Sequence, residues 1–124
     1  MNEESFQKRN RAWVVACMGE EAANNKAERN FRFIEEAIEL VQSCGCSKED
    51  VLKIVDYVFS RPVGESFQEV GGTMTTLASL CNAQGIGLDF AAEAELARCW
   101  TLVDKIRAKA LAKRTHSALP GVPT

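Results

Sequence analysis

The sequence lacks, or contains few of, several features on which common protein functions depend. Its 124 residues include one histidine, His116, near the C-terminal end, which argues against histidine-based catalysis. Lys and Arg (15) nearly balance Asp and Glu (17), for a formal net charge of −2. No overall basic field would therefore attract nucleic acid or an anionic membrane. No apolar run approaches the ~20 residues of a membrane span and the opening MNEESFQKRN is polar, so we expect neither a span nor a signal peptide.

Cysteine occurs five times, an odd number that suits reduced thiols in the cytoplasm better than a disulfide framework. Cys44 and Cys46 stand one residue apart, but neither a second cysteine pair nor a nearby histidine accompanies them. We therefore expect no zinc site at this pair.

Alternating strand patterns of useful length are missing as well, and nearly every break in the chain resembles the end of a helix. Asn24 or Asn25 is a suitable N-cap, with Glu28 in a capping-box position after Asn25, and Ser47 and Asp89 are suitable N-caps further on. The predicted helices cover residues 3–18, 25–43, 48–60, 65–84 and a long segment after Asp89, with breaks at Gly19, Cys44–Gly45, Arg61–Pro62 and Gly85–Gly87.

The length of the chain suffices for one hydrophobic core but not for two. We therefore predict an all-α fold, a compact bundle of four to five helices that forms a single domain over residues 1–115. The segment 116–124, HSALPGVPT, contains two prolines and a glycine, and we expect it to be an irregular tail.

Three glutamates crowd one arc of the helix predicted around FIEEAIELVQ, residues 33–42. Glu35, Glu39 and Glu36 lie at about 0°, 40° and 100° on the helix circumference, and apolar residues cover most of the remainder. Glu35 and Glu39 are like charges four residues apart, and Arg32 compensates only part of the cluster. The cluster is either a solvated polar face or a site for a hard divalent cation, such as Mg²⁺ or Mn²⁺, which selects carboxylate oxygen.

A second pair of acids, Glu65 and Glu69, has the same spacing of four residues in the helix predicted over 65–84. Gly72 shares their face, and a glycine inside a helix costs roughly 1 kcal/mol relative to alanine. The pair Gly71–Gly72 permits close approach of a neighbouring helix, the commoner reason for such a pair, or of a ligand. The opposite face is expected to be core, and it contains Phe67, Val70, Met74, Leu77 and Cys81.

Two segments together resemble the MazG-like, all-α nucleoside triphosphate pyrophosphohydrolases: EEAIE, and later QEVGG…LASLCNAQGIGLD. That family carries Glu-Glu-x-x-Glu on one helix and Glu-x-x-Asp on a later one, which commonly runs into an Asn-x-x-Gly-Ile turn. The resemblance spans roughly residues 28–107, and the matching positions are Glu35, Glu36 and Glu39, then Glu69, then Asn82 with Gly85 and Ile86. Gly72 stands where the family has its aspartate, so Glu65, or failing that Asp56, would have to supply the missing acid.

The resemblance implies a cytoplasmic hydrolase of nucleotide metabolism that cleaves a nucleoside triphosphate to the monophosphate and pyrophosphate. Control of the nucleotide pool, through dATP, dGTP or a similar substrate, is the implied role. Mg²⁺ or Mn²⁺ would be held by Glu36, Glu39 and Glu69, supported by Glu65, and Glu35 would complete the shell or act as the base toward water. Substrate contacts are expected from Arg32, Arg61, Lys105, Asn82 and Trp13, although the cations also suit surface ion pairs and the tryptophan also suits a core.

Two other functions fit the same residues. Gly72 makes a helical binding or regulatory protein with a degenerate site credible, and a purely structural interaction module would simply solvate its acids. The helix over 25–43 also carries apolar residues on almost opposite sides, at Phe33 and Leu40 and at Ile34 and Ile38. A second copy can cover this wide surface, and the family builds its sites beside subunit interfaces, so we expect a homodimer or homotetramer with no membrane and no stable nucleic-acid partner.

Overall fold

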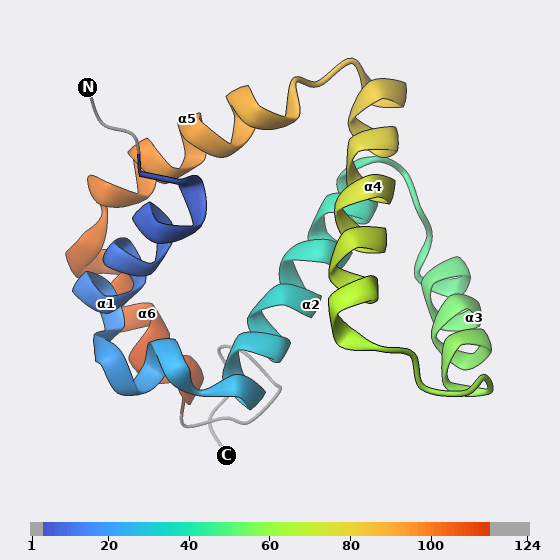
Figure 1. The fold of residues 1–124 in the computed structure, drawn as a ribbon, viewed down its shortest axis with the longest axis horizontal. Coiled ribbons are helices and arrows are strands. Elements are labelled where there is room, and N and C mark those ends of the chain that lie inside the picture. Colours follow the sequence, from blue (N-terminus) through green and yellow to red (C-terminus); the bar gives the residue numbers. More distant parts are fainter. Residues whose placement is uncertain (1–3, 115–124) are drawn as a thin grey trace. The chain divides into compact units, whose positions relative to one another are not determined.

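The computed structural model describes the backbone of residues 4–114, and this range consists of helices and the turns that connect them (Figure 1). The helices are α1 (Phe6–Asn24), α2 (Lys26–Ser43), α3 (Lys48–Phe59), α4 (Ser66–Gln84), α5 (Leu88–Trp100) and α6 (Val103–Arg114). No strand occurs within residues 4–114, so the all-α prediction is confirmed. None of the described helices combines the length and apolar character needed to cross a membrane. The predicted tail 116–124, with His116, lies outside the described residues.

The ends of the helices follow from short-range hydrogen bonds. Ser5 Oγ accepts from the backbone N–H of Lys8 at 3.1 Å, and Ser47 Oγ caps α3 in the same way at 3.1 Å. Asn25 Oδ1 accepts from the N–H of Glu28 at 3.1 Å, which confirms the predicted cap before α2. Gly85 ends α4 in the left-handed conformation, with φ of 71°.

Several helix boundaries differ from the prediction. Gly19 does break the first helix, with φ of 89° and ψ of 167°, but helix resumes beyond it and α1 continues to Asn24. Asp89 lies in the first turn of α5 rather than at its N-cap.

The long last helix predicted after Asp89 is also interrupted, so the described range holds six helices instead of four to five. The break falls at Thr101, whose hydroxyl donates to the Arg98 carbonyl at 2.6 Å. The backbone N–H of Thr101 bonds the same carbonyl at 3.0 Å, three residues back instead of four. A threonine hydroxyl that competes for a helix carbonyl in this way explains why the α-helical pattern ends there.

The contacts between Cα atoms divide the chain into two units, which are described separately. Unit 1 contains Met1–Ile34 and Phe90–Thr124, and unit 2 contains Glu35–Asp89. The prediction of a single domain stays a prediction.

Unit 1 has a small buried core, formed by Val14, Cys17, Ala22 and Leu96. The most extensive helix–helix contact in the described chain joins α1 to α6. The Arg107 guanidinium donates to the carbonyl of Ala16 at 2.7 Å and to that of Cys17 at 3.2 Å. Because Gly19 interrupts the hydrogen-bond ladder of α1, these carbonyls need donors from elsewhere, and α6 supplies them.

Unit 2 consists of the C-terminal part of α2 together with α3 and α4. Within residues 35–89 the one buried residue is Cys81. The rest of the predicted core face of α4 is not core in the single chain, since Phe67, Val70 and Met74 are 86%, 70% and 58% exposed. The helical spacing of these residues was correctly identified, but no element of the described chain covers them.

Candidate functional site

The three glutamates of the first motif lie on the part of α2 that belongs to unit 2. Glu36 and Glu39 are exposed, and Glu35 is half-buried. Their spacing on a continuous helix holds the carboxylates on one arc, as the sequence predicts. Arg32 precedes them on the same helix, three residues before Glu35 and four before Glu36, which is the spacing at which opposite charges interact along a helix.

Glu69 is exposed on the first turn of α4, in the same unit as the α2 glutamates. Its carboxylate folds back over the loop that precedes α4, toward Gly64. A Cβ added at Gly64 would meet Glu69 Oε2, the far end of a flexible and exposed side chain that can move aside. The sequence motif did not reveal that this carboxylate lies beside Gly64.

Glu65 is the N-cap of α4 rather than part of the helix. Its Oε2 accepts from the N–H of Phe67 and its Oε1 from the N–H of Gln68, both at 3.0 Å. These bonds satisfy two of the donors that every helix leaves open at its N-terminus. Capping thus explains this residue without a metal, and its role as a substitute ligand stays a prediction. Asp56, the second substitute, is exposed on α3.

The glycine pair in α4 is not explained by tight packing within the described chain. A Cβ at Gly71 or at Gly72 would meet no atom within 4 Å. The two carbonyls accept from hydroxyls one turn later, Thr75 Oγ1 to Gly71 at 2.8 Å and Thr76 Oγ1 to Gly72 at 3.1 Å. The space beside Gly72, the position at which the pyrophosphohydrolase motif has an aspartate, is therefore open.

The described side chains do not gather into a metal-binding group. Among residues 4–109, no cluster of three or more His, Cys, Asp or Glu side chains has a geometry that could hold a metal ion. The chain places its candidate acids on α2 and around the start of α4 within one unit.

The residues predicted to contact substrate lie in both units. In unit 2, the Arg61 guanidinium stacks on the Tyr57 ring, 5.0 Å from its centroid. Asn82 is exposed at the end of α4, where its carbonyl accepts from the N–H of Gly85 at 3.3 Å. The Arg61 contact is a cation–π interaction that leaves the edge of the guanidinium available to an anion.

Trp13 and Lys105 belong to unit 1. Lys105 is exposed on α6. Trp13 is half-buried on α1, and its Nε1 is shielded from solvent without a hydrogen-bond partner in the part of the chain that the structure describes. An indole N–H normally has a partner when buried, so this group is a candidate donor to a ligand or a second chain.

Unit 1 also contains titratable groups with shifted pKa values that the sequence did not single out. Arg9 Nη1 and Nη2 donate to Glu93 Oε1 and Oε2 at 2.7 and 2.6 Å, and this hydrogen bonding lowers the pKa of Glu93. Burial raises the pKa of the Cys17 thiol, and burial followed by the hydrogen bond to Glu95 raises that of Cys99. Both thiols therefore stay protonated at neutral pH and are poor nucleophiles.

Comparison with known proteins found no matching family model, no similar curated protein and no similar solved structure. The likeness to the pyrophosphohydrolases accordingly rests on the sequence motifs alone and stays a prediction.

Proposed function

We propose that the chain is a divalent-metal-dependent nucleoside triphosphate pyrophosphohydrolase, active in the cytoplasm and in nucleotide metabolism. The observation that carries the proposal is the presence of Glu-Glu-x-x-Glu on α2 and of Glu69 on α4 within the same unit. The donor set fits a hard cation, because every candidate ligand offers carboxylate oxygen and neither imidazole nor thiol is among them.

In this proposal Glu36, Glu39 and Glu69 hold Mg²⁺ or Mn²⁺. The cation would bind the triphosphate oxygens and neutralise charge as the α–β anhydride is cleaved. Glu35, which is half-buried, takes the proton of the attacking water or supports the metal ligands. Arg61, in the same unit as these acids, and Arg32, which precedes Glu36 by one turn of α2, contact the phosphates, since guanidinium groups match phosphate geometry.

A homo-oligomer is part of the same proposal. In the single chain, the candidate acids among residues 4–109 do not form a metal-binding group, and the apolar face of α4 is exposed. A second copy that covers this face would also hold α2 and α4 in a fixed arrangement. We therefore expect metal binding and association to be coupled, so that Mg²⁺ raises the stability of the assembled protein.

Conservative substitution of the acids tests the site. Loss of a residue that merely orients a metal ligand reduces affinity or activity by about 10–100-fold, so Glu36→Gln, Glu39→Gln and Glu69→Gln should each lower pyrophosphate release by about 100-fold or more. Glu49→Gln, in the exposed first turn of α3, is the matched control and should keep wild-type turnover. Variants that unfold while their soluble fraction keeps full specific activity would show that the glutamates are structural.

Screening pyrophosphate release over the common NTPs and dNTPs with wild-type protein identifies the substrate.

A regulatory protein with a degenerate site is the second candidate function. Gly72, at the position of the expected aspartate, favours it. Restoring the acid separates the two candidates, and the open space beside Gly72 accommodates a side chain. If the wild type is inactive and the Gly72→Asp variant hydrolyses nucleotide, the chain has a degenerate form of the enzyme site. A wild type that already turns over nucleotide would exclude this second function.

A further inference from the structure

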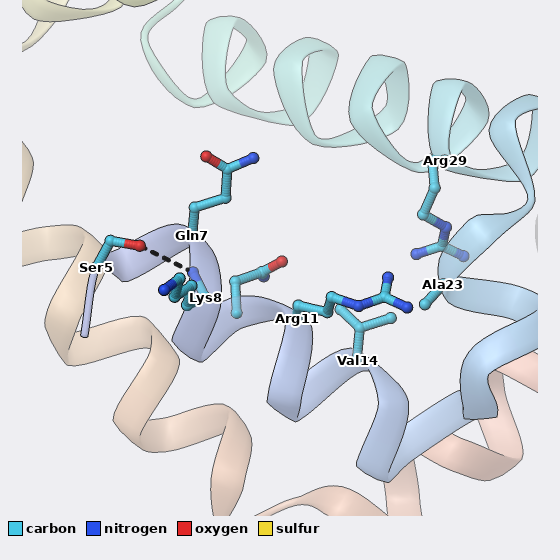
Figure 2. A pocket seen from close by; sticks show the side chains of 8 residues that line it. Ser5, Gln7, Lys8, Arg11, Val14, Ala23 and Arg29 are labelled. Atoms are coloured by element: carbon cyan, nitrogen blue, oxygen red, sulfur yellow. Dashed lines mark hydrogen bonds between the residues drawn. The ribbon is translucent and has the colours of Figure 1, made fainter.

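A pocket lined by basic side chains lies in unit 1. It has a volume of about 560 Å³ and is lined by residues of α1 and by Arg29 near the start of α2. The break at Gly19 turns the chain so that both halves of α1 border the pocket, which Figure 2 shows from close by. Every lining residue belongs to unit 1.

The charged side chains that line this pocket are all positive. Lys8, Arg11 and Arg29 line it, and none of its lining residues is acidic. Arg29 is paired with Glu28 at 3.3 Å. Arg11 Nη1 donates instead to the neutral amide oxygen of Asn24 at 3.0 Å, so its charge is not neutralised by that contact. Lys8 is exposed. A chain with a net charge of −2 thus concentrates positive charge on one concave surface.

The arrangement of the cations suits an anion with several oxygens. Figure 2 shows Arg29 extending beside Ala23 toward the end of the Arg11 side chain. Two guanidinium groups on one side of a pocket repel each other, and an anion between them converts this repulsion into attraction. Guanidinium groups bind phosphate through paired N–H donors, and an ammonium group adds a point charge.

We propose that this pocket binds a small phosphate-bearing anion through Lys8, Arg11 and Arg29. Its volume falls within the roughly 300–1,000 Å³ of ordinary ligand sites, and it exceeds what a single phosphate group fills. Gln7 and Asn10 also line the pocket and offer amide donors and acceptors to the remainder of the ligand. None of the carboxylates of the proposed metal site lines this pocket, and the proposal does not depend on hydrolysis.

Calorimetric titration with inorganic pyrophosphate in the presence of EDTA tests the site. Without a divalent ion the carboxylates repel pyrophosphate, so binding under these conditions reports on the basic pocket. Lys8→Met and Arg11→Met should each weaken binding by about tenfold or more, because each removes a charge-assisted contact. Lys53→Met, an exposed lysine on α3, is the matched control and should bind as the wild type does.

Parallel titrations with inorganic phosphate and AMP distinguish a bare phosphate site from a nucleotide site, and binding of either supports the proposal. Arg11→Met also loses the contact to Asn24, so Lys8→Glu provides a charge reversal that leaves that contact intact. The proposal is wrong if wild-type protein binds none of these anions, or if Lys53→Met weakens binding as much as Lys8→Met. Glu36→Gln should retain pyrophosphate binding in EDTA, so failure of the proposed hydrolase and failure of this pocket are distinguishable.

Discussion

Unit 1 and unit 2 are built from helices of similar length but differ in what they bury. Unit 1 encloses Val14, Cys17 and Leu96, and long-range polar contacts from Arg9 and Arg107 connect its helices. Unit 2 buries Cys81, and the side-chain hydrogen bonds of α3 and α4 are local caps and hydroxyl contacts. The difference indicates that unit 1 has a core within the chain, whereas unit 2 presents apolar surface that must be covered by something else.

The largest effect is expected from removing an exposed apolar side chain of unit 2 that a second copy would cover. Phe67 is 86% exposed in the single chain, so a polar substitution would be nearly neutral if the chain acted alone. If α4 forms a subunit interface, Phe67→Ser removes about 1.5–3 kcal/mol of burial from each copy. Dissociation of a dimer should then increase by more than about 100-fold, which sedimentation over a range of protein concentrations measures.

Phe90→Ser is the control in this experiment. Phe90 is 80% exposed on α5 in unit 1, so it matches Phe67 in type and exposure. We expect little change in association from it. The apparent melting temperature of wild-type protein should also rise with concentration. A wild type that sediments as a monomer at micromolar concentration and hydrolyses nucleotide normally would contradict the oligomer while leaving the metal site untested by this measurement.

A smaller effect, on stability, is expected from replacing one glycine in each unit by alanine. Gly19 of unit 1 has φ of 89° and ψ of 167°, a region that is essentially restricted to glycine, so Gly19→Ala should destabilise by about 1–3 kcal/mol. Gly71 of unit 2 lies inside α4 with open space around it, so Gly71→Ala should stabilise by roughly 0.5–1 kcal/mol. Denaturant unfolding followed by circular dichroism measures both.

Opposite signs for the two alanine variants would confirm that the first glycine is required by its backbone and that the second is not. A destabilising Gly71→Ala would instead show that another surface packs closely against α4 in the assembled protein. That surface is absent from the single chain, so this outcome would strengthen the case for association and locate it on the glycine face of the helix.

The local features of the fold were predictable because each is encoded within a few residues. Asn25 and Ser47 cap the helices that follow them, and Gly85 ends α4, as their types and positions predict. Glu65 was placed inside α4 because glutamate is less typical of an N-cap than Ser, Asp or Asn. The break at Thr101 was missed because a threonine hydroxyl only sometimes competes successfully with the helix.

Contacts between distant residues could not be predicted from the sequence. Periodicity placed Glu35, Glu36 and Glu39 on one arc of α2, and this is a property of a single helix. Whether Glu69 joins them depends on how two helices pack, which no short pattern specifies. The pairing of Arg9 with Glu93 likewise brings together residues 84 positions apart. The sequence therefore predicted how the acids are spaced along each helix, whereas their role as ligands and their arrangement between helices stay predictions.

The smallest expected effect concerns the ion pair that connects α1 to α5. Arg9 lowers the pKa of Glu93 below its ordinary value of 4.5 in the folded protein. Protons therefore bind the unfolded state more readily, so the pair stabilises the fold above that ordinary value and its contribution is lost as pH falls through the folded pKa. Glu93→Gln should lower the melting temperature near neutral pH, and its difference from wild type should shrink as the pH falls below the ordinary value of 4.5.

Glu95→Gln is the local counterpart of this variant. Glu95 also has a lowered pKa, but its partner Arg98 is three residues away on the same helix. A pair of this kind persists wherever residual helix forms in the unfolded chain, so it contributes less to the difference between the two states. Both pairs are exposed and should weaken with salt. If Glu95→Gln changed the pH dependence as much as Glu93→Gln, the contact between α1 and α5 would add nothing specific to the stability of unit 1.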